Sequence, residues 1–183
     1  YTVQDGDVSN DLAYTSDSAL SLNSGTIRSS SNNNSSNILK TPGSSYSLSA
    51  NKEIIIDTVR PSIAITSDVA SLKDDETANL SFTLSEASNN FTDSDLTVSG
   101  GSISGFSGSG TSYSATFTPT ANSTTNGVIS VASNKFSDSA GNTNNDGSDA
   151  NNSVTLNVDT LRPSIAITSD VASLKDDETA NLS

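Results

Sequence analysis

One stretch of 25 residues occurs twice in the chain, almost without change. Residues 57–81 and 159–183 share the sequence DTxRPSIAITSDVASLKDDETANLS and differ only at Val59 and Leu161. The two copies are 102 residues apart, which suits an independent β-sandwich and is too long for one turn of a solenoid. The chain is therefore expected to contain tandem units of about this length.

The repeat also sets the expected domain boundaries. Residues 58–159 make one complete unit. Residues 1–57 are expected to be the C-terminal part of a preceding unit of a different subtype, because they do not match the end of the complete unit, and residues 160–183 are expected to be the first strands of the next unit. A proline in each linker, Pro61 or Pro163, fixes φ and predicts a short, stiff joint.

Apolar and polar residues alternate throughout the complete unit, which is the pattern of half-buried strands. Gly-rich and Asn-Gly turns separate these stretches, and no window has helical periodicity. Seven short strands in about 100 residues predict an all-β fold of tandem immunoglobulin-like β-sandwich domains. The expected inward-facing residues are Ile63, Ile65, Leu80, Phe82, Leu84, Leu96, Val98, Ile103, Phe106, Tyr113, Ala115, Phe117, Ile129, Val131, Val154, Leu156 and Val158.

The first 57 residues give a weaker pattern. Leu20 and Leu22 alternate with polar residues, and residues 54–56 are three successive isoleucines that predict a final strand. Between them, residues 28–36 read RSSSNNNSS, a low-complexity run that predicts a loop.

The composition excludes several classes of function. The chain has no His, Cys, Met or Trp, so it cannot form a Ser-His-Asp triad, a cysteine nucleophile or the usual zinc, copper and haem sites. We therefore expect no enzyme. The net charge of −13 argues against nucleic acid and anionic membranes as partners, and no apolar run is long enough to span a bilayer. Since the chain lacks an initiator Met and a signal segment, we expect it to be a piece of a longer, secreted or cell-surface protein.

The acids of the complete unit are expected to gather at one end of the sandwich. Strand directions place the loops after the second and sixth strands beside the incoming linker, and converging carboxylates repel one another unless a cation neutralises them. Ca²⁺ takes six to eight oxygen ligands of this kind. The predicted calcium ligands are Asp57, Glu86, Asp93, Asp95 and Asp138. The alternative is that Asp and Asn are common here because they favour turns.

Two smaller acidic groups complete the set. At the opposite end, Asp74 and Asp75 should approach Asp159 of the next linker. A solvated acidic turn is the favoured interpretation, and a second calcium bridging the joint is the alternative. Near the N-terminus, Asp5, Asp7 and Asp11 lack the spacing and final Glu of an EF-hand loop.

A series of motifs in residues 57–183 resembles a known family. The order D-T-x-x-P-x-I-x-I-T-S-D, L-K-x-x-E-T-A, F-T-x-S-E-A, F-x-x-x-D-L, Y-x-A-T-F-T-P and F-x-D-x-A-G-N is similar to the bacterial Ig-like repeats of giant surface adhesins, both biofilm-associated and RTX-type. The resemblance implies extracellular tandem domains that form a stalk, often stiffened by Ca²⁺ between domains. It favours Asp57, Glu86, Asp95 and Asp138 as ligands. Residues 1–57 resemble the tail of a related Ig/cadherin-like repeat, and they depart from its pattern at Ala13 and residues 30–34.

These observations predict a structural spacer in a bacterial surface adhesin that supports cell adhesion or biofilm formation. Its partners would be adjacent Ig-like repeats, with host or neighbouring-cell surfaces contacted through other domains. Two alternatives stay open: a module that binds a glycan or a cell surface, and a spacer attached to a secreted enzyme.

Overall fold

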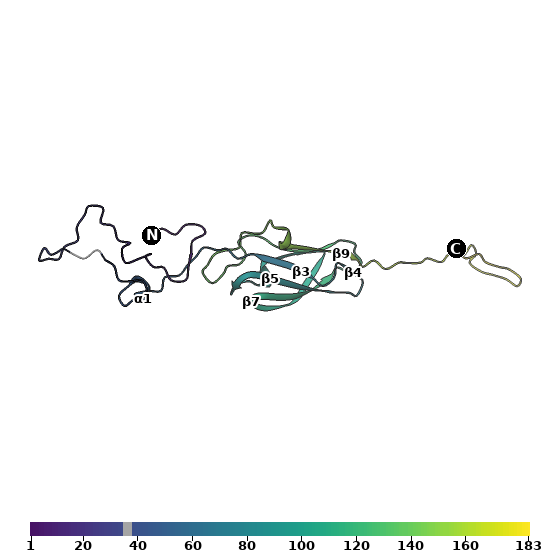
Figure 1. Cartoon of the computed structure of the whole chain (residues 1–183). Helices are drawn as coiled ribbons and strands as arrows, with labels where there is room; N and C mark the ends of the chain where they lie inside the picture. The colour runs from purple at the N-terminus through teal and green to yellow at the C-terminus, as the bar shows by residue number, and fades with distance from the viewer. Residues whose placement is uncertain (35–37) are drawn as a thin grey trace.

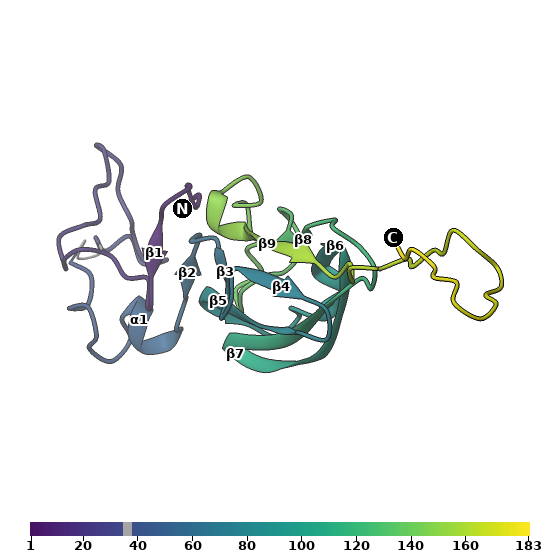
Figure 2. The ribbon, with the colours of Figure 1, turned by 90° about the vertical axis from the view of Figure 1, so that its right-hand side faces the viewer.

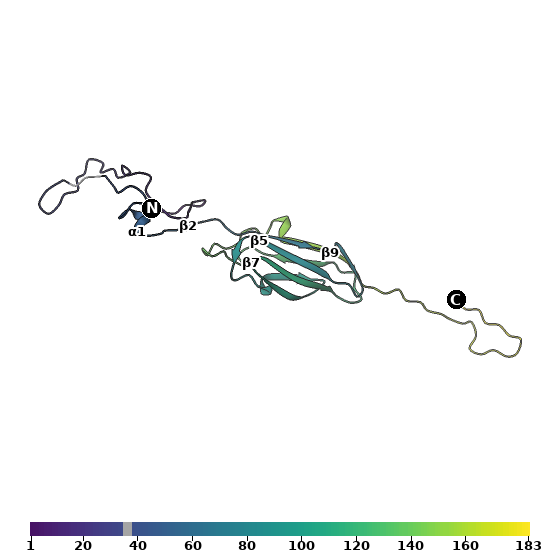
Figure 3. The same cartoon turned by 60° about the horizontal axis from the view of Figure 1, so that its bottom comes forward.

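The computed structural model describes residues 1–34 and 38–183. It is elongated: a central sandwich lies between an N-terminal segment made mainly of loops and an extended C-terminal arm (Figures 1 and 3). The chain enters the sandwich at one end and leaves it at the other, as expected for a unit in a linear array.

Three strand segments make the first sheet, in the order β3-β5-β7. They are β3 (Ile63–Ser67), β5 (Ala78–Ser88) and β7 (Gly101–Pro119). Both pairings are antiparallel, and they place Ile65 opposite Phe82 and Phe82 opposite Tyr113. Alternate residues of each strand therefore form one apolar face, as their period of two predicts.

The long segment β7 folds back on itself, as its curve in Figure 2 shows. The Thr120 N–H donates to the Gly100 carbonyl at 3.0 Å, and the hydroxyls of Ser107 and Ser114 lie 3.5 Å apart. Glycine permits the positive φ of +63° at Gly110 in the turn. The two halves correspond to the separate strands predicted around Ile103 and around Tyr113 to Phe117.

The second sheet has the order β4-β9-β8-β6. Its strands are β6 (Leu96–Ser99), β8 (Gly127–Val131), β9 (Ser153–Asp159) and β4 (Ser71–Lys73). β4 is parallel to β9 and places the buried Leu72 opposite Val158. The sequence predicted only a loop here, because one apolar residue between polar neighbours gives no periodic signal.

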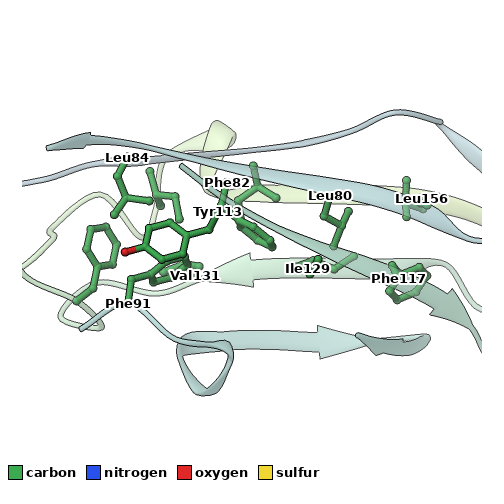
Figure 4. Packing of buried hydrophobic residues seen from close by; sticks show 14 of the residues in the cluster. Leu80, Phe82, Leu84, Phe91, Tyr113, Phe117, Ile129, Val131 and Leu156 are labelled. Carbon is green, nitrogen blue, oxygen red and sulfur yellow. The ribbon is translucent and has the colours of Figure 1, made fainter. Parts of the chain in front are cut away.

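The core lies between the two sheets (Figure 4). Every predicted inward-facing residue is buried in it or packed against its edge. Phe91, Phe136 and Leu72 also belong to the core, although their sequence context did not identify them. The predicted all-β immunoglobulin-like sandwich is thus confirmed. Two single-turn 3₁₀ helices, Asp93–Asp95 and Ala150–Asn152, precede β6 and β9.

The N-terminal segment contains one strand pair and one short helix. β1 (Val8–Ser9) pairs antiparallel with β2 (Ile56–Asp57), so the predicted final strand begins only at Ile56. The four-residue helix α1 (Leu48–Asn51) is capped by the Ser47 hydroxyl. In the predicted loop, residues 35 and 36 lie outside the described residues. In the part of the chain that the structure describes, Leu20 and Leu22 lie outside strands, and no helix is long and apolar enough to cross a membrane.

A tight backbone approach at Gly100 gives a first testable prediction. Gly100 has φ +72°, and a Cβ there would lie 2.2 Å from the Asn126 carbonyl oxygen. Gly105 has a similar φ of +64° but open space around its Cα. Both alanine substitutions carry the cost of the left-handed backbone, about 1–2 kcal/mol. Only Gly100→Ala adds a clash, so its melting temperature should fall clearly below that of Gly105→Ala; equal melting temperatures would contradict this packing.

Candidate functional site

The first candidate site is the upper joint, defined as linker residues 57–61, the end of β5 and the loop 132–149 between β8 and β9. An antiparallel bridge joins Ser88 to Asp138. The Asn142 side-chain amide donates to the Asp57 carbonyl at 3.0 Å. The sequence analysis predicted that the linker and the loops after the second and sixth strands converge at one end of the sandwich, and this is confirmed.

Asp138 organises the loop at this joint. Its side chain is buried, and its Oδ1 accepts hydrogen bonds from the backbone N–H groups of Gly141 (2.7 Å) and Asn142 (2.9 Å). Its Oδ2 accepts from the Asn142 Nδ2 at 2.9 Å. Asn142 thus connects the Asp138 carboxylate to the linker.

Glu86, at the end of β5, lies in an unfavourable environment for a charged group. Burial raises the pKa of its carboxyl, and the negative charges of Asp57 and Asp138 raise it further. Its Oε2 is buried without a hydrogen-bond partner among the described residues. A buried, unpartnered acceptor beside two other acids is costly, which makes Glu86 the centre of the candidate site.

Asp93 and Asp95 are the two predicted ligands that lie between β5 and β6. Both lie in the 3₁₀ turn before β6, where Asp95 Oδ2 accepts a hydrogen bond from the Thr92 N–H at 2.8 Å. This is a local cap of the turn. The two carboxylates whose negative charges raise the pKa of Glu86 are Asp57 and Asp138.

Two loop residues outside the predicted ligand set hold the upper joint in place. Asn144 is fully buried; its Oδ1 accepts from Lys135 N (2.7 Å) and Phe136 N (3.2 Å), and its Nδ2 donates to Ala132 O (2.9 Å). Asp146 accepts from Asn144 and, at 2.6 Å, from the Ile63 N–H at the start of β3. In an Asn-rich loop, no sequence signal distinguishes the structural asparagine from its neighbours.

The donor set fits a hard cation only in part. The carboxylate oxygens of Glu86 and Asp57 are of the type that Ca²⁺ prefers, but both oxygens of Asp138 already accept hydrogen bonds. In residues 1–34 and 38–183, no three acidic side chains are arranged closely enough to form a metal site. A bound ion would thus need the loop around Asp138 to adjust or backbone oxygens to contribute.

The lower joint, where β9 leads into the second linker, carries its own positive charge. Arg162 donates through Nε to Asp74 and through Nη2 to Asp75 at 2.9 Å. These acids raise the pKa of Arg162, with Asp74 the stronger influence. The Asp159 Oδ1 accepts from the Leu161 N–H at 3.1 Å. The favoured prediction of a solvated acidic turn omitted this ion pair, because Arg162 is 87 positions from Asp75 in the chain.

The three N-terminal acids, Asp5, Asp7 and Asp11, do not form a common site. The Asp7 carboxylate accepts hydrogen bonds from the Gln4 N–H and the Tyr1 hydroxyl, each at 2.7 Å, and these lower its pKa. Asp5 and Asp11 are exposed. Asp7 thus stabilises a turn before β1.

Exposed aromatic residues, which a glycan-binding site usually needs, are few in the described structure. Phe82, Tyr113 and Phe117 are buried, as predicted. Tyr1 and Tyr46 are exposed, but both belong to the N-terminal segment. A groove beside β4 and β9 is lined by aliphatic, polar and charged residues, among them Leu72 and Lys73.

Comparisons with known proteins agree with this architecture. The family model described as "Bacterial Ig-like domain" matches residues 57–158. Neither the curated proteins nor the solved structures that were compared gave a match. Because the family match covers more than half of the chain, and because the sandwich has the expected strands, this chain belongs to the bacterial Ig-like domain family, whose members are generally non-catalytic and commonly extracellular or surface modules.

Proposed function

We propose that this chain is an extracellular spacer segment of a bacterial surface adhesin and that Ca²⁺ stiffens its upper joint. The family and the elongated arrangement of sandwich, linkers and flanking segments support the spacer role. The repeated 25-residue segment supports a tandem array, since neighbouring spacer units can share a sequence that a unique binding site would not need twice.

The observation that carries the calcium proposal is the buried Glu86 Oε2 without a partner, beside Asp57 and Asp138. A divalent cation would neutralise the repulsion between these carboxylates. Glu86 and Asp57 would hold the ion, and Asp57 belongs to the linker, so the ion would connect the linker to the end of the sandwich. At the lower joint the guanidinium of Arg162 already pairs with both Asp74 and Asp75, so we place no ion there.

Thermal unfolding of the full chain tests the calcium proposal. An ion that binds only the folded state stabilises it by about 2.7 kcal/mol at one hundred times its Kd. The melting temperature should rise with calcium, and magnesium should not reproduce the rise. The response should disappear in Asp57→Asn and Glu86→Gln and persist in Asp93→Asn. An unchanged melting temperature at millimolar calcium would overturn the metal proposal and leave the spacer proposal standing.

Glu86 should also make stability depend on pH when calcium is absent. Its pKa is raised in the folded state, so the folded protein binds more protons than the unfolded protein above the ordinary value of 4.5. Stability from this group is therefore present below that value and is lost as the pH rises through the folded pKa. In a chelator, Glu86→Gln should melt at a higher temperature than wild type at pH 7, because the amide carries no charge for Asp57 and Asp138 to repel. It should melt at the same temperature near pH 4.

A lower melting temperature of Glu86→Gln at pH 7 in the chelator would mean that the charged carboxylate stabilises the folded protein without a cation. That result would contradict the calcium proposal.

A further inference from the structure

In each of the two linkers, a threonine at the equivalent position is hydrogen-bonded to the preceding unit. Thr160 is 2% exposed, and its hydroxyl accepts a hydrogen bond from the Ser123 N–H at 2.8 Å. The same hydroxyl lies 2.8 Å from the Thr120 carbonyl and 3.1 Å from the Ser123 carbonyl, one of which receives its proton. The backbone N–H of Thr160 also donates to Ser123 O at 2.9 Å.

Thr58 occupies the equivalent position in the first linker, 102 residues earlier. Its hydroxyl accepts from the Gly6 N–H at 2.9 Å and donates to the Asp7 carbonyl at 3.0 Å. Thr58 and Thr160 each follow the last strand before a linker, β2 or β9. Thr58 contacts the loop before β1, the strand that pairs with β2. Thr160 contacts the loop before β8, a strand that pairs with β9.

The receiving loops differ in sequence, Asp5-Gly6-Asp7 in one case and Thr120 to Ser123 in the other. They nevertheless present the same chemistry, one backbone N–H and one backbone carbonyl. A threonine hydroxyl can satisfy both groups at once, because it is a donor and an acceptor. The contact therefore needs the linker threonine and the backbone of the preceding unit, and it tolerates different loop side chains.

We propose that the threonine of the D-T-x-R-P linker is a positioning residue that fixes each unit to the one before it, independently of metal. This inference rests on the proposed spacer function, because it assumes that the linkers join successive units. The Arg162 ion pair is exposed and so adds little to the stability of the joint. The hydroxyl of Thr160, by contrast, is buried and hydrogen-bonded to the unit that ends at β9.

Amide hydrogen exchange in the full chain, measured with chelator present, tests the first part of the proposal. Thr160→Val keeps the side-chain shape and removes the hydroxyl, leaving the Ser123 N–H without its acceptor. Exchange of the Ser123 amide hydrogen should become about ten- to one-hundredfold faster, as expected for loss of a partly buried hydrogen bond. Thr160→Ser should restore slow exchange. Thr155→Val makes the same chemical change on the exposed face of β9 and should leave Ser123 unaffected.

A distance measurement tests the positioning role itself. The chain has no cysteine, so spin labels can be attached at Thr97→Cys in β6 and Ser164→Cys after the linker. Thr160→Val should broaden the distance distribution, and Thr160→Ser should keep it narrow, while slow exchange at Ile129 confirms that the sandwich is folded. An unchanged Ser123 rate, or a faster rate without broadening, would overturn the proposal. Because chelator is present throughout, failure of the calcium proposal would leave this result unaffected.

Discussion

Replacing Phe91 with alanine should lower the stability of the sandwich more than any other single substitution considered. Phe91 is 4% exposed, and its ring centroid lies 5.1 Å from that of Tyr113, 5.2 Å from that of Phe136 and 5.6 Å from that of Phe106. Truncating a buried phenylalanine costs about 3–5 kcal/mol. That is a large share of the roughly 5–15 kcal/mol that a domain has in total, so the melting temperature should fall by more than about 12 °C.

Phe106→Ala is the matched control, because this ring belongs to the same cluster but is only half-buried, in the first half of β7. The fall in melting temperature caused by Phe106→Ala should be distinctly smaller in the same experiment. A loss at Phe106 as large as at Phe91 would mean that Phe91 is not the centre of the aromatic cluster.

Asn144→Leu should have the second largest effect. Leucine has a similar size but cannot accept from the N–H groups of Lys135 and Phe136, nor donate to the Ala132 carbonyl. A buried polar group left unsatisfied costs about 1–3 kcal/mol, and this applies most fully to the N–H of the buried Phe136, because water can reach the exposed Lys135 and Ala132. The loop 132–149 should lose its position, and with it Asp138 and the response of the melting temperature to calcium. Chemical denaturation and a calcium titration of the variant measure both effects.

The neighbouring Asn145 is exposed and serves as the control. Asn145→Leu should change stability by less than about 0.5 kcal/mol. If the two variants behaved alike, the hydrogen bonds of Asn144 would not be what holds the loop.

The repeated segment separates what local sequence determines from what the fold determines. The turn after β3 forms in both copies: Asp68 accepts from the Asn79 N–H at 2.8 Å, and Asp170 accepts from the Asn181 N–H at 2.9 Å. Asp75 and its counterpart Asp177 both have φ +65°. Burial differs completely, since Ile63 is 1% exposed and its counterpart Ile165 is 87% exposed. Turn geometry is thus local, whereas burial requires the partner strand β5.

The same distinction explains which parts of the site were predictable. Strand alternation was sufficient to bring Asp57, Glu86 and Asp138 to one end, because strand directions follow from strand order. Individual partners could not be predicted, since Asp95 caps its own turn and Arg162 pairs with acids far away in the chain. Phe91 also escaped prediction, because one aromatic residue between loop residues has no periodicity.

The central claim is that calcium orders the joint between the N-terminal segment and the sandwich. Spin labels at Asn10→Cys, beside β1, and Thr83→Cys, on the exposed face of β5, would report the distance across the upper joint in the full chain. We predict a narrow distance distribution with calcium, a broader one with chelator or magnesium, and no response to calcium in Glu86→Gln. Identical distributions with calcium and with chelator would contradict the claim.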